Sequence, residues 1–212
     1  MAHLYNEETI SQAIDTKWAG KTVHFARETD STNLWGKRAW REEGAGHGEL
    51  FVAEYQSAGR GRFTRRWSAP PDSAITMSIL ICPEFSPQKA PMLTLVMGLS
   101  VAQAVAELGL EVGIKWPNDV VVSRKKICGI LTEMTMKQDK IGCAVIGVGI
   151  NVNMESFPEE MADKATSLYL ESGHPFDRAQ VVGLVMKHFE ENYERFVQTE
   201  DLSGLKPDYE KM

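Results

Sequence analysis

The sequence predicts an α+β fold, in which helices cover a mixed, largely antiparallel sheet. The spacing of the predicted strands is the first reason, because many follow one another too closely for the crossovers of a parallel sheet, which take about a dozen residues or more. The second reason is a long apolar segment over residues 91–108, whose apolar surface is wide enough for a helix lying across a sheet.

Length and composition are those of an ordinary globular protein. The chain has 212 residues, enough for one substantial core, with 43% hydrophobic and 25% charged residues. These values exclude wholesale disorder. The net charge of −6 makes the protein a poor non-specific binder of nucleic acid, so we expect no nucleic-acid partner.

Hydrophobic periodicity and turn residues define the first half of the chain. Alternation at Ile75, Met77 and Ile79 is typical of a strand, and Pro91 suits the first turn of a helix. The predicted elements are a helix over 9–17, a strand over 22–26, a helix that begins at Ser31 or Thr32, strands over 50–55 and 74–81, and the helix over 91–108. Thr94 and Gln103 interrupt this last segment, which falls short of the ~20 residues of a membrane span, so we expect a buried helix and no membrane association.

In the second half of the chain the same patterns predict four strands, over residues 112–116, 120–122, 126–136 and 140–150, and one long helix over residues 177–198. Glycines inside strands usually mark a bulge or a close approach of the backbone to a ligand. We therefore predict that Gly129, Gly147 and Gly149 form the floor of a pocket.

Cys82, Cys128 and Cys143 are odd in number and lie in apolar runs, without the spacing of a zinc site or a disulfide framework. They are expected to be small buried hydrophobes in a reducing compartment. Because the N-terminus carries neither a basic nor an apolar export region, we predict a cytoplasmic protein.

Residues 54–67 read E-Y-Q-S-A-G-R-G-R-F-T-R-R-W and contain the four arginines 60, 62, 65 and 66. Glycine lets main-chain N–H groups approach a ligand, and the arginine fork matches phosphate or carboxylate. A mobile loop that closes over an anion is the functional interpretation. A solvated basic turn is the alternative.

Residues 30–33, D-S-T-N, precede a helical pattern. Ser31 or Thr32 could simply cap that helix. Alternatively, their hydroxyls and the free N–H groups of the helix start could form a cradle for a ligand oxygen.

Four motifs in order give the chain a family resemblance: D-S-T-N, the arginine loop, K-W-P-N-D (115–119) with K-K-I-C-G-I-L (125–131), and G-V-G-I-N-V-N (147–153). Over about residues 22–200 this series resembles the biotin protein ligases, whose catalytic domain shares its fold with class II aminoacyl-tRNA synthetases. The resemblance implies that biotin and ATP form biotinyl-5′-adenylate, which then acylates a lysine of the biotin carboxyl carrier domain of a carboxylase.

The resemblance also implies roles for individual residues. Arg60, Arg62 and Lys126 are the expected catalytic residues, with Lys126 chosen over Lys125 by its spacing to Gly129; an exposed strand-end lysine is the alternative. The expected biotin-binding residues are Ser31, Thr32, Asn33, Gln56, Gly59, Arg60, Lys126, Gly129 and Gly147.

The nucleotide side is implied in the same way. Trp67 is expected beside the adenine, although it could belong to the core. Asp119 is the expected contact for Mg²⁺, through water. The expected nucleotide-binding residues are Arg62, Arg65, Trp67, Lys115, Asn118 and Asn151.

Two departures from the family pattern concern domains. We expect no DNA-binding domain before the first motif, and we expect residues 201–212 to be a polar tail where many members begin a small C-terminal β-domain, with residues 1–200 as the catalytic domain. A homodimer is possible. The rival interpretations are a lipoate or octanoate ligase, a non-catalytic biotin sensor and a nucleic-acid module.

Overall fold

A seven-stranded sheet forms the centre of the computed structural model, which describes residues 4–63, 65–117 and 119–212. The strand order is β1-β2-β3-β7-β6-β5-β4. Only β1 and β2 run parallel; all other neighbours are antiparallel, which confirms the predicted mixed, largely antiparallel sheet. The strands are β1 (Val23–Thr29), β2 (Leu50–Gln56), β3 (Ala74–Ile81), β4 (Val112–Lys115), β5 (Asp119–Val122), β6 (Lys125–Lys137) and β7 (Lys140–Asn151).

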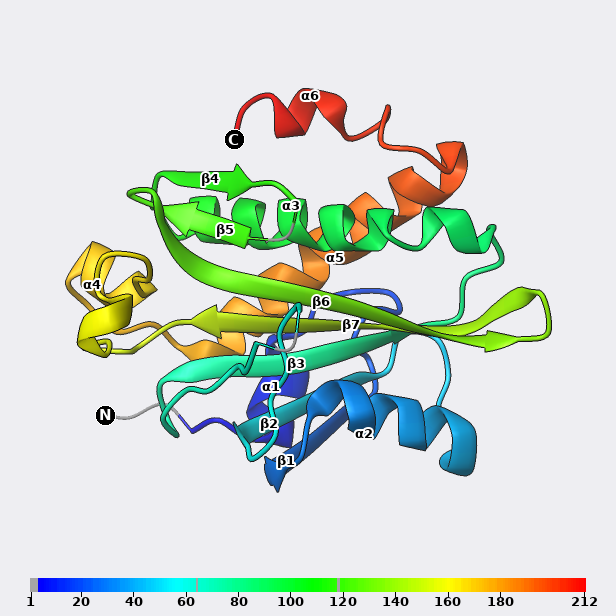
Figure 1. Ribbon diagram of the computed structural model, residues 1–212, viewed down its shortest axis with the longest axis horizontal. Helices are drawn as coiled ribbons and strands as arrows, with labels where there is room; N and C mark the ends of the chain where they lie inside the picture. The colour runs from blue at the N-terminus through cyan, green and yellow to red at the C-terminus, as the bar shows by residue number, and fades with distance from the viewer. Residues whose placement is uncertain (1–3, 64, 118) are drawn as a thin grey trace.

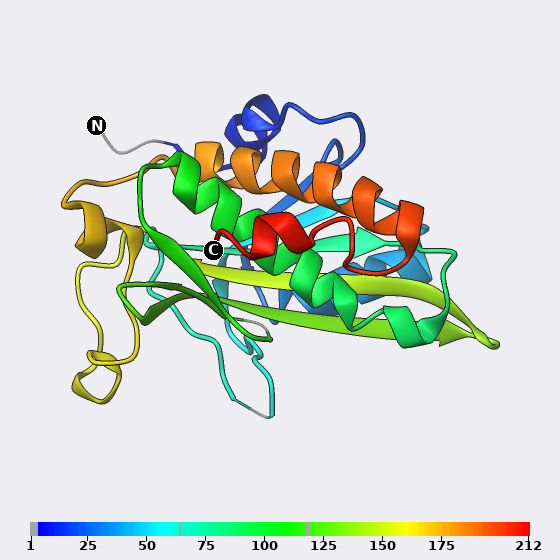
Figure 2. The ribbon, with the colours of Figure 1, turned by 90° about the horizontal axis from the view of Figure 1, so that it is seen from above.

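Helices lie on both faces of this sheet (Figure 1). One face carries α1 (Glu7–Ala13), α3 (Met92–Glu107) and α5 (Arg178–Thr199). The other face carries α2 (Thr32–Arg38), which packs on β2, β3 and β7. Figure 2 shows that the segment between β2 and β3 projects from the sheet on the side away from α3 and α5. The arginine-rich segment and α2 therefore lie on the same side of the sheet.

The core lies mainly between the sheet and the helices α3 and α5. Every residue of β3 is buried, because β3 is a central strand that is covered on both faces. By length and composition, Pro87–Glu107 is the one stretch of the described chain that could cross a membrane, but 61% of its apolar window is buried inside the molecule. Since α3 packs against α5 and β6, this stretch is a core helix, as predicted.

Most predicted elements are present, with shifted ends. The strand predicted over 74–81 has those bounds in the structure, whereas the first helix spans Glu7–Ala13 instead of 9–17, because Asn6 caps it from its first turn. The helix α4 (Leu168–Ser172) was not predicted. Neither was α6 (Lys206–Tyr209), which packs onto the body: Leu205 is buried and Asp208 pairs with Arg195 at 2.7 Å.

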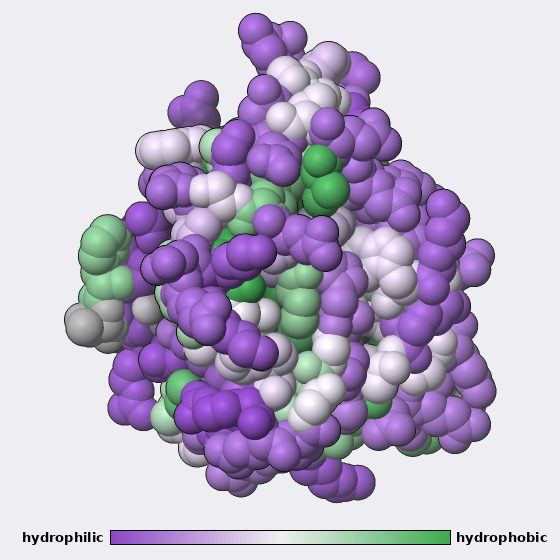
Figure 3. Space-filling model, turned by 90° about the vertical axis from the view of Figure 1, so that its right-hand side faces the viewer, coloured by the Kyte–Doolittle hydropathy of each residue, from purple (hydrophilic) through white to green (hydrophobic). Residues whose placement is uncertain are grey.

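Hydrophilic side chains dominate the end of the molecule that Figure 3 faces, and apolar ones show in a hollow near the centre and in smaller places around it. The three cysteines are free. Cys128 and Cys143 are buried as predicted, whereas Cys82 is only partly buried, so the prediction of a buried side chain is wrong for Cys82.

Candidate active site

The arginine-rich segment is a hairpin with a paired base. Trp67 N donates to Gly59 O at 3.0 Å, and Gly61 N donates to Arg65 O at 2.7 Å. A Cβ at Gly59 would overlap the carbonyl oxygen of Trp67, so the pairing requires glycine there. These two bonds pair the strands of the hairpin at its base, between the ends of β2 and β3.

A single guanidinium joins the two ends of the segment. Arg178, in the first turn of α5, binds the carboxylate of Glu54 at 2.6 and 3.1 Å and the carbonyl of Ala74 at 3.1 Å. Glu54 precedes the hairpin in β2, and Ala74 begins β3. Arg178 is only 6% exposed, and its guanidinium lies 4.0 Å from the ring centroid of Tyr5.

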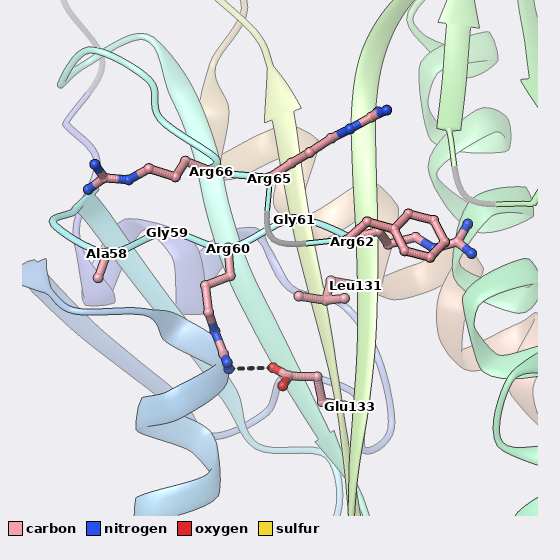
Figure 4. Close-up of a pocket in the computed structure, with 10 residues that line it drawn as sticks. Ala58, Gly59, Arg60, Gly61, Arg62, Arg65, Arg66, Leu131 and Glu133 are labelled. Atoms are coloured by element: carbon pink, nitrogen blue, oxygen red, sulfur yellow. Dashed lines mark hydrogen bonds and ion pairs between the residues drawn. The ribbon is translucent and has the colours of Figure 1, made fainter.

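Under the hairpin lies a cavity of about 520 Å³, whose walls come from the hairpin and from β6. In Figure 4 the side chain of Arg60 points down to Glu133, whereas Arg65 and Arg66 extend in opposite directions from the top of the hairpin. The lining residues are Ala58, Gly59, Arg60, Gly61, Arg62, Phe63, Arg65, Arg66, Leu131 and Glu133. The cavity is thus rich in positive charge, with one carboxylate in its wall.

The start of α2 forms one polar group with Gln56, the last residue of β2. Thr32 donates to the Gln56 side-chain oxygen through its backbone N at 2.8 Å and its hydroxyl at 3.1 Å. Ser31 occupies the N-cap position, yet its side chain makes no capping bond although the residue is 2% exposed. Ser31 therefore lies at the predicted N-cap position but does not cap the helix with its side chain.

Asn33 fills a space that depends on Gly147. The Ser78 hydroxyl donates to Asn33 Oδ1 at 2.6 Å, and Asn33 Nδ2 donates to Leu131 O at 3.1 Å. A Cβ on Gly147 would coincide with the amide oxygen of Asn33. The absence of a Cβ on Gly147 therefore leaves room for the polar side chain of Asn33. We call a glycine that makes room for a neighbouring side chain in this way a glycine seat.

Gly129 and Gly149, which pair across β6 and β7, are seats as well. A Cβ on Gly149 would lie 2.5 Å from the indole of Trp67, and a Cβ on Gly129 would lie 3.0 Å from Lys126 Nζ. We predicted that these glycines form the floor of a pocket; in the structure the space above each is occupied by another predicted site residue. Trp67 Nε1 is buried and has no hydrogen-bond partner among the described residues, so it is available to a ligand acceptor.

Lys126 and Asp119 form an ion pair, with Nζ 2.7 Å from Oδ1. The two charged atoms are close enough for an ion pair, but the angles of the contact do not suit a hydrogen bond, so Asp119 Oδ1 has no well-directed donor. Lys125 instead donates to Ala162 O at 2.9 Å, on the surface. Of the two neighbouring lysines, only Lys126 reaches the glycine seats.

Glu133 accepts from three side chains. Asn33 Nδ2 lies 2.9 Å and Arg60 2.7 Å from its Oε2, and Lys37 Nζ lies 2.9 Å from its Oε1. Burial by itself would raise the pKa of this carboxyl, but the hydrogen bonds from Asn33 and Lys37 and the charges of Lys37 and Arg60 hold the pKa below its usual value. The group is therefore a carboxylate at neutral pH.

The remaining predicted residues lie farther from this group. Asn151 is buried on β7 and donates to Thr166 O at 3.0 Å, and Lys115 is exposed at the end of β4. Arg62 lies 5.0 Å from the ring centroid of Phe63 at the hairpin tip. Asn118 lies outside the described residues.

Sequence reasoning missed Glu133, Ser78, Lys37 and Leu131. A signal for two of them exists, because Gly129, Leu131 and Glu133 alternate along β6 and so share one face of the sheet. Ser78 is the cross-strand partner of Gly147, a relationship that only the strand register reveals. Lys37 follows Asn33 by one helical turn.

No cluster of three or more metal-binding side chains occurs within residues 4–63, 65–117 and 119–212. Asp119, the predicted metal contact, lies opposite Gly129 in the sheet and pairs with Lys126. A single carboxylate suits Mg²⁺ only when the ion arrives with phosphate oxygens and water as its other ligands.

Comparison with known proteins agrees with this geometry. Residues 25–151, from β1 to the end of β7, match the model of the biotin/lipoate A/B protein ligase family. The chain belongs to this family. A family member of solved structure, a biotin protein ligase from Aquifex aeolicus in complex with biotin and ATP, is 34% identical, with a TM-score of 0.76 over 91% of this chain and 78% of that one.

Curated relatives in the biotin/lipoate ligase family extend the comparison. The bifunctional ligase/repressor BirA of Bacillus spizizenii is 43% identical over 72% of this chain and 48% of its own length. The biotin–[acetyl-CoA-carboxylase] ligase of Mycobacterium tuberculosis is 36% identical over 68% of this chain and 53% of its own length. The chain thus spans about half the length of the curated relatives that it matches.

Proposed function

We propose that this chain condenses biotin with ATP to biotinyl-5′-adenylate and then transfers the biotinyl group to a lysine of a biotin carboxyl carrier domain. The observation that carries the proposal is the convergence of Asn33, Trp67 and Lys126 on three glycine seats beside a cavity under four arginines. Membership of the family and likeness to a ligase with bound biotin and ATP support the same conclusion.

The first step needs positive charge. A carboxylate oxygen of biotin bonds to the α-phosphorus of ATP, and the bond from that phosphorus to the bridging oxygen breaks, releasing pyrophosphate. Two anions meet in this step, so cations that face the reacting atoms lower the barrier. Arg60 and Arg62 line the cavity, and Lys126 lies on Gly129; we assign these three as the catalytic residues.

Binding of the biotin ring system requires donors and acceptors in a dry site. The Ser31 hydroxyl, the Thr32–Gln56 pair and Asn33 are buried or nearly so, and we assign them to the polar ureido end. Gly59, Gly129 and Gly147 would act indirectly, by making room for neighbouring side chains.

The nucleotide would lie toward Trp67. Its buried, unpartnered indole N–H fits an acceptor on the ligand, and Asn151 lies farther along β7. We assign Arg65, Lys115 and Asn118 to the phosphates and Asp119 to a water-mediated contact with Mg²⁺. When bound, that ion would neutralise phosphate charge.

In the second step the carrier lysine amine attacks the acyl carbonyl, and the carbonyl–phosphate bond breaks to release AMP. The mixed anhydride survives until then only if water is excluded. The arginine hairpin, anchored at its base, is the element that would close over it.

We extend the proposal to the setting of the enzyme. Residues 1–200 form the catalytic domain, the protein acts in the cytoplasm, it has no nucleic-acid partner, and it can form a homodimer. Oligomeric state by light scattering and DNA binding by titration at low and high salt would test the last two points directly.

The deciding experiment uses purified protein with ATP, Mg²⁺ and equal amounts of biotin, lipoate and octanoate, followed by mass spectrometry. Biotinyl-adenylate as the main product supports the proposal. Lipoyl- or octanoyl-adenylate would assign the chain to the lipoate branch of the family, and no adenylate would contradict ligase activity. A carrier domain added afterwards should gain one biotinyl group on lysine.

A further inference from the structure

Glu133 is the residue through which the hairpin and α2 meet. Its two oxygens contact a guanidinium from the hairpin, an ammonium from α2 and an amide from α2. The carboxylate is about one-fifth exposed, so the contacts are only partly screened by water. None of the roles assigned above uses it.

An acid in the wall of this cavity is unexpected, because the proposed substrates are anions. Its charge is balanced by Lys37 and Arg60, both within 2.9 Å, so the three groups together carry a net charge of about +1. The carboxylate therefore does not repel an anion on balance. It lets two cations lie close together.

Arg60 offers a fork of several donors, of which one nitrogen, Nη2, contacts Glu133 in the described structure. The remaining donors can bind a ligand while the contact to Glu133 persists. The guanidinium is 41% exposed and lines the cavity. A side chain as flexible as arginine gains most from such a fixed partner.

Glu133 also belongs to a continuous polar chain. Gln56 contacts Thr32, the Ser78 hydroxyl lies 2.7 Å from that of Thr32 and 2.6 Å from Asn33 Oδ1, and Asn33 contacts Glu133. The chain runs from the start of α2, where we assign the ureido ring, to the hairpin arginine.

We infer that Glu133 is a positioning residue that holds the Arg60 guanidinium in place over the cavity, so that the hairpin retains the acyl-adenylate. This inference rests on the proposed function. It assigns to Glu133 an effect that passes through Arg60 and not through contact with the substrate.

The test compares adenylate retention in wild type, Glu133→Gln, Arg60→Gln and the double variant, by loading each with biotin and ATP and timing release on a desalting column. Glu133→Gln should speed release roughly two- to fivefold, the range expected for one partly exposed charged contact. In the Arg60→Gln background the same change should have almost no further effect. Equal effects in both backgrounds, or slower release in Glu133→Gln, would overturn the inference.

Lys37→Gln is the matched control, because Lys37 binds the other carboxylate oxygen and leaves the Arg60 contact intact. Its effect on release should be smaller than that of Glu133→Gln; an equal or larger effect would mean that α2 packing matters and Arg60 does not. Glu133→Asp, which keeps the charge, should release adenylate at an intermediate rate and serves if Glu133→Gln does not fold.

A second readout does not depend on ligase activity. Trypsin cleaves after the hairpin arginines, and cleavage needs the hairpin to open. Without ligands, Glu133→Gln should be cut in the hairpin faster than wild type and Lys37→Gln. If wild type made no adenylate, the proposed function would fail while this digestion still decided the Arg60 contact: equal cleavage rates would overturn it.

Discussion

The amide of Asn33 occupies the space in which a Cβ at Gly147 would have to lie. Helix α2 can pack this closely on strand β7 only because position 147 has no side chain. With any larger residue there, the asparagine would lose its hydrogen bonds to Ser78, Leu131 and Glu133. The glycine and the asparagine therefore act as one unit.

Gly147→Ala should lower the free energy of unfolding by about 1–3 kcal/mol, because an overpacked side chain must shift and lose hydrogen bonds. It should also weaken biotin binding. Gly98→Ala is the control: its Cβ would meet only Ile130 at 3.7 Å, an ordinary contact, and alanine in a helix should raise stability by up to ~1 kcal/mol. Urea unfolding and biotin titration measure both; an unchanged Gly147→Ala protein would contradict the pairing.

Arg60→Gly should release free adenylate and label bystander proteins with biotin, because the hairpin loses its contact to Glu133 and its cation over the cavity. Streptavidin blots of a mixture with serum albumin would measure the labelling. Arg66→Gly, on the opposite strand of the hairpin, should label far less, since Arg66 points away from Glu133 in Figure 4. Wild-type retention in Arg60→Gly would disprove the role of the hairpin as a lid.

Lys126→Gln should reduce adenylate formation by about 100-fold or more, the usual effect of removing one group that stabilises developing charge. Lys125→Gln should stay near wild type, because the Lys125 ammonium donates to Ala162 O on the surface. Pyrophosphate release measured with a coupled assay separates the two. Equal losses would indicate a general requirement for positive charge at this strand end.

Acid should weaken the start of α2. Asp30 forms hydrogen bonds with Arg38 at 2.7 and 3.0 Å; these, the Ser31 N–H and the Arg38 charge lower the pKa of Asp30 to about 2, against the smaller effect of burial. The stabilisation is complete above the ordinary carboxyl pKa of about 4 and is lost as the pH falls toward 2. Both side chains are more than a third exposed, so it amounts to about 1 kcal/mol at most.

Asp30→Asn should therefore be less stable than wild type at pH 6, and the difference should vanish near pH 2. Urea unfolding at pH 6, 4 and 2.5 measures it. A difference that stays constant with pH would mean that the contact to Arg38 contributes through shape and not through charge.

Sequence patterns predicted the elements in which every side chain lies in the same kind of environment. The bounds of β3 were predicted because all of its residues are apolar or small and lie between two covered faces. The short helix α6 was not predictable, because it has four residues and its position depends on the contacts of Asp208 with Arg195 and of Tyr209 with Leu95.

The candidate site was predicted residue by residue through family resemblance, but its internal relationships were not. The sequence shows that Gly129, Gly147 and Gly149 need space above them, and cannot show which side chain takes that space. The answer depends on the register of β6 against β7 and on the angle of α2. Glu133 was missed for the same reason: its partners Lys37 and Arg60 come from segments about 96 and 73 residues away.

The hydrogen bonds of the Arg178 guanidinium to Glu54 and Ala74 have an evolutionary consequence. Because one buried guanidinium fixes where the chain leaves β2 and where it enters β3, the segment between them can change in length or composition without disturbing the register of the sheet. Natural variation can therefore remodel the cover of the cavity, and with it the size of the acyl group that fits beneath, while the strands that present the glycine seats stay unchanged.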